Sequence, residues 1–167
     1  REARAIAAAK QDDKVGAPNF PCVATIEPSR YAEGRCYVAF DAHRQNDDKP
    51  YVYMTDDYGQ TWKSITANLP TFGSTRCLRE DLYNPNLLYC GTEFAVFASI
   101  NRGGSWTKLN NNLPTVAVHE VAVHPTAGEI VAATHGRGVW IMDVSALRQI
   151  TADAVQSKAM LYKPNTV

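Results

Sequence analysis

The stretch Thr55-Asp56-Asp57-Tyr58-Gly59-Gln60-Thr61-Trp62 decides the fold, because the chain repeats it as Ser99-Ile100-Asn101-Arg102-Gly103-Gly104-Ser105-Trp106. Both copies follow the order hydroxyl, any residue, Asp or Asn, any residue, Gly, any residue, hydroxyl, Trp. The tryptophans are 106 − 62 = 44 residues apart, and Asn68-Leu69-Pro70 recurs with the same period as Asn112-Leu113-Pro114. A fixed period of this size with strand-like content indicates the blades of a propeller or a related array.

The residue types in the motif suit a tight hairpin turn. A short acidic or amide side chain accepts backbone N–H bonds inside a turn, and glycine permits a positive φ. The second hydroxyl can bond back across the turn, and the tryptophan can pack beneath it. We therefore expect a structural role for the ten motif positions, which are Thr55, Asp57, Gly59, Thr61, Trp62, Ser99, Asn101, Gly103, Ser105 and Trp106.

Short segments rich in β-branched and aromatic residues, bounded by Gly, Pro and Asn, read as strands. Two repeats contain four such segments each, and a third contains three before the motif is lost after Asp143. The predicted strands are 22–26, 36–40, 51–54 and 61–65, then 76–79, 87–92, 95–98 and 105–109, then 119–123, 129–134 and 138–142. The predicted fold class is all-β, a partial β-propeller of about three four-stranded antiparallel blades with short flanking helices.

The same pattern predicts the organisation of the chain. We expect an N-terminal helix or linker at 1–16 and blades over 17–144, at about 17–70, 71–114 and 115–144. Residues 145–167 then form a C-terminal helix with a possible closing strand at 159–163. About three blades cannot close a ring that usually needs four to eight. We therefore expect a piece of a longer protein, with the remaining blades in the parent chain or in another chain.

Composition excludes several classes of function. The 167 residues carry no net charge, and the basic residues form no stripe that would bind nucleic acid. No apolar run approaches the roughly 18 residues of a membrane span. Phosphate-binding and nucleophile motifs are absent, no metal site is expected because the histidines and cysteines lack ligand spacing, and no cofactor is implied. Cys22, Cys36, Cys77 and Cys90 are expected as half-buried apolar residues on strands, although Cys77 and Cys90 fall on neighbouring strands where a disulfide is conceivable.

The eight-residue motif resembles the Asp-box, or BNR repeat, of sialidases, sortilin-type receptors, xyloglucanase-type hydrolases and a photosystem assembly factor. With Asn86–Glu93, Leu113–His119 and Ala133–Asp143, residues 20 to 150 look like the final blades of bacterial sortilin-like BNR-repeat proteins, often labelled glycosyl hydrolases. The resemblance implies a β-propeller, a secreted, periplasmic or cell-envelope location, and a binding or scaffold role. The sequence departs from the motif at Asn101, where Asp is usual, and in the third blade.

Loops of a blade alternate between its two ends, so the loops that join the second and third strands lie opposite the motif. Together with the connections between blades, they hold most of the polar side chains that suit ligand binding. The candidate ligand-binding residues are Asp41, His43, Arg44, Glu93, His135 and Arg137. Arginine binds carboxylate or phosphate with a rigid fork, and histidine titrates near neutral pH. The alternative is a set of solvated loops in which Arg137 pairs with Glu93 or Asp41.

Two functions follow. The first is a non-catalytic recognition or scaffold module that binds protein or glycan ligands. The alternative is a fragment of a glycoside hydrolase, which needs two carboxylates about 5–5.5 Å or roughly 6.5–9.5 Å apart. The acids near the right loops are Asp41, Asp47, Asp48 and Glu93, and no catalytic residue is assigned. Aromatic platforms for sugars are not expected on this face, because all three tryptophans occupy strand positions.

Overall fold

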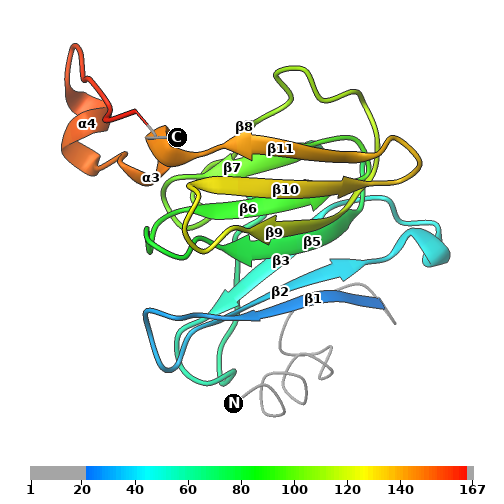
Figure 1. Cartoon of the computed structure of the whole chain (residues 1–167). Coiled ribbons are helices and arrows are strands. Elements are labelled where there is room, and N and C mark those ends of the chain that lie inside the picture. Colours follow the sequence, from blue (N-terminus) through cyan, green and yellow to red (C-terminus); the bar gives the residue numbers. More distant parts are fainter. Residues whose placement is uncertain (1–21, 165–167) are drawn as a thin grey trace.

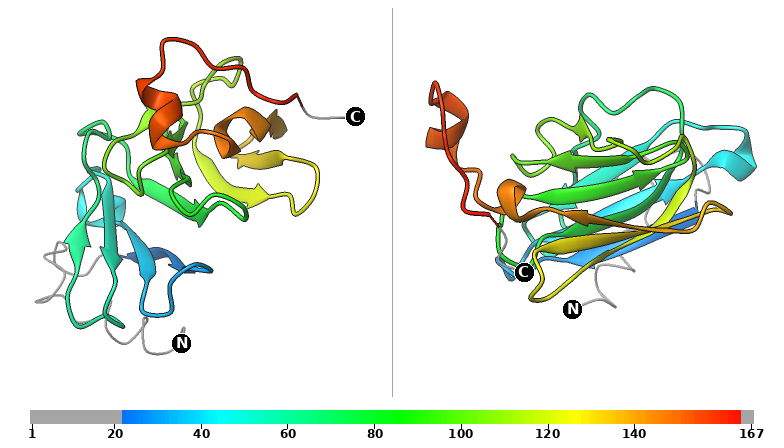
Figure 2. Two further views of the ribbon diagram at one scale, coloured as in Figure 1. Left: turned by 90° about the vertical axis from the view of Figure 1, so that its left-hand side faces the viewer. Right: turned by 45° about the horizontal axis from the view of Figure 1, so that its top comes forward.

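The computed structural model describes residues 22–164, so the helix or linker expected at 1–16 lies outside the described residues. Three antiparallel sheets lie side by side in this part of the chain (Figure 1), and each forms a propeller blade. The first two blades have four strands and the third has three, which confirms a partial propeller. Viewed along the strands, the sheets fan out beside one another (Figure 2).

The strands lie close to the ranges predicted from the sequence. Blade 1 contains β1 (Cys22–Pro28), β2 (Cys36–Asp41), β3 (Tyr51–Thr55) and β4 (Lys63–Ser64). Blade 2 contains β5 (Thr75–Glu80), β6 (Leu88–Thr92), β7 (Val96–Ser99) and β8 (Thr107–Lys108). Blade 3 contains β9 (Val118–Val123), β10 (Glu129–Thr134) and β11 (Val139–Asp143), in the order β11-β10-β9.

Two expectations about the strands need correction. The outer strands β4 and β8 are only two residues long, so Trp62 and Trp106 lie just before them rather than in them. The segment 159–163 is not a strand, since the described chain beyond β11 holds α3 (Ser145–Arg148), α4 (Ala152–Gln156) and coil. The coil is held instead by Gln149, whose side-chain amide exchanges two 2.9 Å hydrogen bonds with the backbone of Lys163.

The core lies between the blades. Strand β5 contacts β1 and β2 of the preceding blade, and β9 contacts β5 and β6 in the same way. Fully buried side chains such as Tyr37 and Leu78 fill the first interface, and Tyr89 and Ile130 fill the second. Because burying such a side chain contributes roughly 1.5–3 kcal/mol, each blade depends on its neighbour for stability.

The two motif turns share one hydrogen-bond pattern. Asp57 Oδ1 accepts from the Thr61 N–H at 2.8 Å, and Asn101 Oδ1 accepts from the Ser105 N–H at 2.8 Å. The hydroxyl of Thr61 donates to Asp57, whereas the Asn101 amide donates to Ser105 Oγ at 2.9 Å. Hydrogen bonds from the Thr61 side chain and backbone lower the pKa of Asp57 to about 2. The Asn101 amide therefore replaces the Asp57 carboxylate, with the direction of the hydrogen bond to the second hydroxyl of the motif reversed.

Asn68 explains why Asn-Leu-Pro repeats with the motif. Its side-chain amide donates to the Trp106 carbonyl at 3.0 Å and accepts from the Trp106 N–H at 2.7 Å. The Trp106 indole donates to the Ile65 carbonyl at 2.9 Å. These three bonds fasten blade 2 to the chain leaving blade 1. The corresponding indole N–H of Trp62 is buried and has no hydrogen-bond partner in the described part of the chain.

Two consecutive buried carboxylates at the end of β5, Glu80 and Asp81, also connect the blades. Glu80 accepts hydrogen bonds from the Ser29 hydroxyl at 2.8 Å, the Arg30 N–H at 2.8 Å and the Tyr37 hydroxyl at 3.1 Å, all in blade 1. Asp81 is ion-paired with Arg148 of α3 at 2.9 Å. These contacts tie blade 1 and the C-terminal segment to blade 2.

No disulfide joins any of the four cysteines within the described residues. Residues directly opposite on antiparallel strands share a face, and the pairs here are Cys77 with Gly91 and Leu78 with Cys90. Cys77 and Cys90 therefore point to opposite faces of the sheet and cannot form the disulfide considered above. Burial raises the pKa of the Cys77 thiol to about 12.

Among residues 22–164, no helix has the length and apolar character needed to cross a bilayer.

Candidate ligand-binding face

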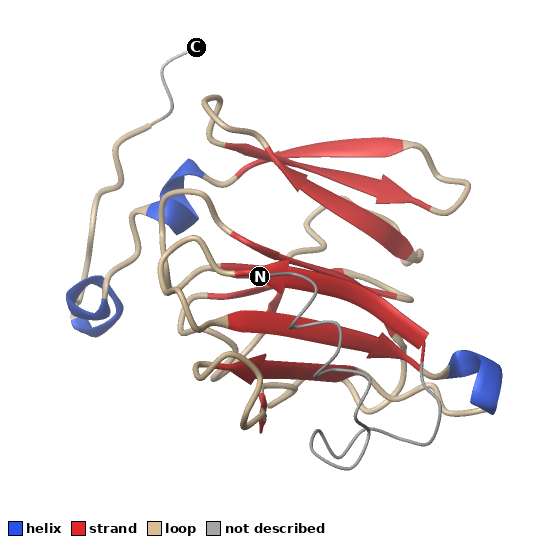
Figure 3. Cartoon of the chain, turned by 90° about the horizontal axis from the view of Figure 1, so that it is seen from below, coloured by secondary structure: helices blue, strands red, loops and turns tan. Residues whose placement is uncertain are grey.

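The loops gather at two ends of the sheets, as expected. At one end, the Tyr58 N–H donates to the Gly34 carbonyl and the Arg102 N–H donates to the Asn86 carbonyl, so the motif turns sit with the first hairpins. At the other end, the Gly73 N–H donates to the Asp48 carbonyl and the Glu93 N–H donates to the Ser74 carbonyl. The short helix η1 (His43–Gln45) lies at this second end, away from α3 and α4 (Figure 3).

Arg76 of β5 organises the second end. Its Nη1 lies 2.5 Å from Asp41 Oδ2, and its Nε and Nη2 lie 2.8 Å and 2.5 Å from Glu93 Oε2. His43 joins the group because its Nδ1 lies 2.7 Å from Asp41. The structure thus brings together three predicted residues through an arginine that the sequence analysis missed. Arg137, which the alternative interpretation paired with Glu93 or Asp41, takes no part in this network.

The network favours the ionised form of Asp41. Burial alone would raise the pKa of Asp41, but hydrogen bonds from the His43 backbone and imidazole and the charge of Arg76 outweigh it and lower the pKa. The side chains of Arg76 and Asp41 are only 16% and 10% exposed, whereas Glu93 is 36% exposed. A single positive charge on Arg76 therefore pairs with two carboxylates in a partly dry site, where ion pairs are strongest.

A β-bulge places Arg76 where it can do this. In blade 2 the strand register skips Arg76, which lies between the paired residues Thr75 and Cys77. The same irregularity leaves Ala24 unpaired in β1 and His119 unpaired in β9. Bulges redirect side chains and recur at functional edges of sheets. An arginine among apolar residues at the start of an inner strand was the only sequence signal for this role.

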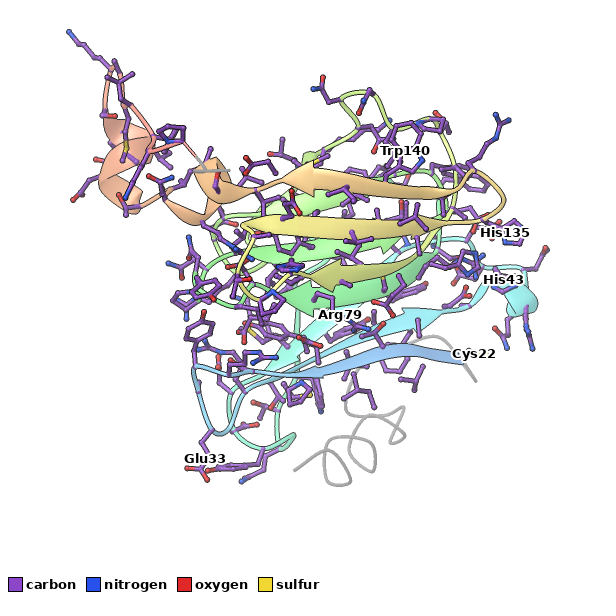
Figure 4. The ribbon with its side chains drawn as sticks, in the orientation of Figure 1. Cys22, Glu33, His43, Arg79, His135 and Trp140 are labelled. Atoms are coloured by element: carbon purple, nitrogen blue, oxygen red, sulfur yellow. The ribbon has the colours of Figure 1, made fainter. Side chains whose placement is uncertain are left out.

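The remaining predicted residues reach this end but stay apart from the network. His135 follows β10, and its ring lies 5.2 Å from that of His119, centroid to centroid. Figure 4 shows His43 and His135 at the same end of the sheets and Glu33 at the opposite end. Arg44 and Arg137 are exposed, and neither side chain has a hydrogen bond or ion pair with another described residue.

An aromatic pair lies on this face, contrary to expectation. Phe72, in the connection between blades 1 and 2, is stacked on Phe94 with ring centroids 5.7 Å apart and planes 18° apart. Phe72 is 61% exposed. It borders a shallow pocket whose other lining residues are Asn46, Asp47, Asp48, Lys49 and Thr71. Only the tryptophans had been considered as platforms, so this pair was overlooked.

The arrangement suits recognition more than bond cleavage. It offers an exposed aromatic ring and, among the described residues, two arginines whose side chains have no partner and two histidines at the same end as the ion-paired Arg76. No group of three or more His, Cys, Asp or Glu side chains in residues 22–164 is placed to hold a metal ion. Asp41 and Glu93 share a single arginine, and the lowered pKa of Asp41 disfavours the protonated form that a general acid needs.

No protein-family profile matches the chain, and no curated protein sequence is significantly similar to it. Solved structures show the same fold. The GH74 enzyme of Niastella koreensis matches with a TM-score of 0.57 and 17% identity over 72% of this chain and 21% of that one. YCF48 bound to a D1 peptide matches with a TM-score of 0.53 and 18% identity over 76% and 39%. The GH74 xyloglucanase of Xanthomonas campestris matches with a TM-score of 0.52 and 14% identity over 72% and 22%.

These likenesses establish a propeller-type fold. The chain spans about a fifth of the length of the GH74 enzymes and about two fifths of the length of YCF48.

Proposed function

We propose that this chain is a non-catalytic recognition and scaffold module, part of a larger Asp-box, BNR-repeat propeller that binds protein or glycan ligands. The ligand-binding face comprises Asp41, His43, Arg44, Glu93, His135 and Arg137, with Arg76 and Phe72 added by the structure. We propose a secreted, periplasmic or cell-envelope location, which the Asp-box resemblance supports.

One observation carries this proposal against the hydrolase alternative. Arg76 bonds to both Asp41 and Glu93 on this face. Glycoside hydrolysis needs one carboxyl group whose raised pKa keeps it protonated as the general acid. The pKa of Asp41 is lowered instead, and Glu93 is ion-paired. The two groups therefore act as structural anions that fix Arg76 and His43.

Further blades are the first partners that we propose. The outer face of blade 3 carries Ala122, Val131, Ala133, Val139 and Ile141, of which Ala122, Val139 and Ile141 are exposed. Glu120 already accepts a 2.8 Å hydrogen bond from Arg79, which also pairs with Glu27 of blade 1. Figure 4 shows Arg79 at the centre of the three sheets. An apolar face of this kind is expected to pack against another blade of the same propeller.

Ligand binding is tested by screening the chain against an array of glycans, xyloglucan fragments included, and a displayed peptide library. We expect a ligand whose binding is lost in Phe72→Ala and Arg137→Ala and is unchanged in Arg102→Ala, because Arg102 lies in a motif turn at the other end. Binding that depends on Arg102 but not on Phe72 or Arg137 would place the site elsewhere and contradict the proposal.

The hydrolase alternative has its own assay. Reducing ends are measured after incubation of the same glycans with the chain and, where it is identified, with the intact parent protein. We expect no release above buffer. Release by either protein that disappears in Asp41→Ala or Glu93→Ala would establish the hydrolase and overturn the proposed function.

A further inference from the structure

Blade 3 is one strand short on its outer side. Strands β3 and β7 each pair with an outer strand, whereas β11 pairs only with β10 in the described part of the chain. Val139 and Ile141 of β11 are 67% and 66% exposed. A strand edge with unpaired backbone groups and exposed apolar side chains is a template for a further strand.

A pocket beside this edge repeats the surroundings of Trp106. Its lining includes Val96, Asn112 and Leu113. Each follows its counterpart by one period, since 96 − 52 = 112 − 68 = 113 − 69 = 44. The counterparts Val52 and Leu69 pack in one cluster with Trp106, and Asn68 holds the Trp106 backbone.

Blade 3 supplies the other wall of the pocket. Trp140 and Met142 alternate along β11 with the exposed residues and are half-buried against blade 2. Trp140 lies along β11, the outermost strand of the blade (Figure 4). The complete wall on this side consists of Ile130, Ala132, Trp140, Ile141 and Met142. The pocket thus has lining positions between blades 2 and 3 that match those around Trp106 between blades 1 and 2, but its volume of about 20 Å³ means that its walls must separate to admit an indole.

Among the described residues, the asparagine at this pocket lacks the partner that Asn68 has in Trp106. Asn68 makes two hydrogen bonds to Trp106, but the exposed side chain of Asn112 makes none with any described residue. No tryptophan follows blade 3 in the position that Trp106 takes in blade 2, because the chain enters α3 after Asp143. Asn112 is therefore in place, but the described residues contain no tryptophan equivalent to Trp106 for it to bond.

We propose that the outer edge of β11 receives a fourth strand from a further part of the parent polypeptide, and that this strand begins with a tryptophan. The arm carries the order hydroxyl, any, Asp or Asn, any, Gly, any, hydroxyl, Trp. The indole enters the pocket, the tryptophan N–H and C=O bond to the Asn112 side chain, and the following residues pair antiparallel with β11. This inference rests on the proposal that further parts of a propeller complete the chain, but not on any ligand at the loop face.

The test appends such an arm to the full chain. Residues 99–109 are copied onto the C-terminus behind a flexible Gly/Ser linker, which raises the local concentration of the arm to about millimolar. Hydrogen exchange of the β11 amides is followed by mass spectrometry or NMR. We expect exchange in β11 to slow at least about tenfold, because the outer N–H groups become hydrogen-bonded.

Three matched proteins decide the outcome. An arm with alanine in place of its tryptophan, and the native arm on an Asn112→Ala chain, should both return β11 to the exchange rate of the unextended chain. Asn111→Ala, a change at the exposed neighbouring residue, should keep the protection. Unslowed exchange with the native arm would overturn the proposal, and so would equal slowing with the alanine arm.

A second copy of this chain is the competing occupant. In that case the unextended chain would show β11 protection that rises with protein concentration together with its mass by light scattering, and our assignment of the occupant would be wrong. None of these results depends on the loop-face assays, so the two proposals stand or fall separately.

Discussion

Arg148 of α3 donates from Nε to Oδ2 of Asp81 at 2.9 Å, across 67 residues of sequence, and the Asp81 side chain is 0% exposed. The Tyr89 hydroxyl also donates to Asp81 Oδ2 at 3.1 Å, and the N–H groups of Tyr83 and Asn84 donate to Oδ1. Asn84 in turn donates to the Arg148 carbonyl at 3.2 Å. The segment after blade 3 is thereby anchored on blade 2.

Asp81→Asn should destabilise the chain by about 3–5 kcal/mol, because it leaves the mostly buried Arg148 guanidinium without its counter-charge. The free energy of unfolding is measured by urea titration with circular dichroism. The control is Asp153→Asn, an exposed acid in α4, for which we expect a change within about 0.5 kcal/mol. Equal effects of the two substitutions would mean that the ion pair contributes little.

Asn68→Ala should cost about 1–3 kcal/mol, since it removes two hydrogen bonds that join blades 1 and 2, each with a net contribution of about 1 kcal/mol. Asn112→Ala, at the equivalent position one repeat later, should be nearly neutral in the same chain because its side chain has no partner among residues 22–164. The comparison uses the same urea titrations. A large loss of unfolding free energy in Asn112→Ala would show that the Asn112 side chain already bonds to a partner.

Asp57→Asn should preserve the fold, because Asn101 shows that an amide satisfies the same turn. The pKa of Asp57 in the folded chain, about 2, lies below its ordinary 3.8. The ionised carboxylate therefore stabilises the fold above pH 3.8, and this contribution is lost as the pH falls toward 2. The thermal midpoint of the variant should lie below that of the parent at pH 6 and converge with it near pH 2. A constant difference across this range would contradict the assignment.

Arg76→Met should raise the pKa of Asp41, because burial raises that pKa and the variant loses the positive charge of Arg76 that opposes burial. The pKa of Asp41 in the folded parent is lower than its ordinary value. The ionised carboxylate therefore stabilises the fold when the pH is above that ordinary value, and this stabilisation is lost as the pH falls through the pKa of the folded state. The loss of stability in Arg76→Met should accordingly be largest near pH 7 and shrink at acid pH.

The measurement for Arg76 is a carboxyl carbon NMR titration of Asp41. Arg76→Lys is the control, since it keeps the charge while losing the fork that reaches Asp41 and Glu93 together. It should give an intermediate pKa. An Asp41 pKa that is the same in all three proteins would remove Arg76 from the electrostatics of the face.

Thiol labelling should find one reactive cysteine in the folded chain. Cys22 is exposed, whereas Cys36, Cys77 and Cys90 are buried, and burial raises the pKa of both Cys77 and Cys90. A thiolate is the reactive form, so the three buried thiols should react only after unfolding. The rate of reaction with Ellman's reagent, with and without denaturant, measures this. Resistance of Cys77 and Cys90 even in denaturant would instead indicate a disulfide.

The 44-residue period by itself determined the blade architecture and the position of nearly every strand. It did so because the motif turn is a local structure: Thr55, Asp57 and Thr61 satisfy one another within seven residues, whatever surrounds them. Alternating apolar residues then placed the strands on either side. The same local logic predicted correctly that Asn101 would serve in place of Asp.

Only the tertiary structure decided what the loop face contains. Arg76 reaches Asp41 and Glu93 across 35 and 17 residues because a bulge turns it toward them, and a bulge has no reliable sequence signature. The stack of Phe72 on Phe94 and the ion pair of Arg148 with Asp81 likewise join segments that are distant in the sequence. Sequence periodicity records how a repeat folds, whereas contacts between repeats depend on how their loops meet in space.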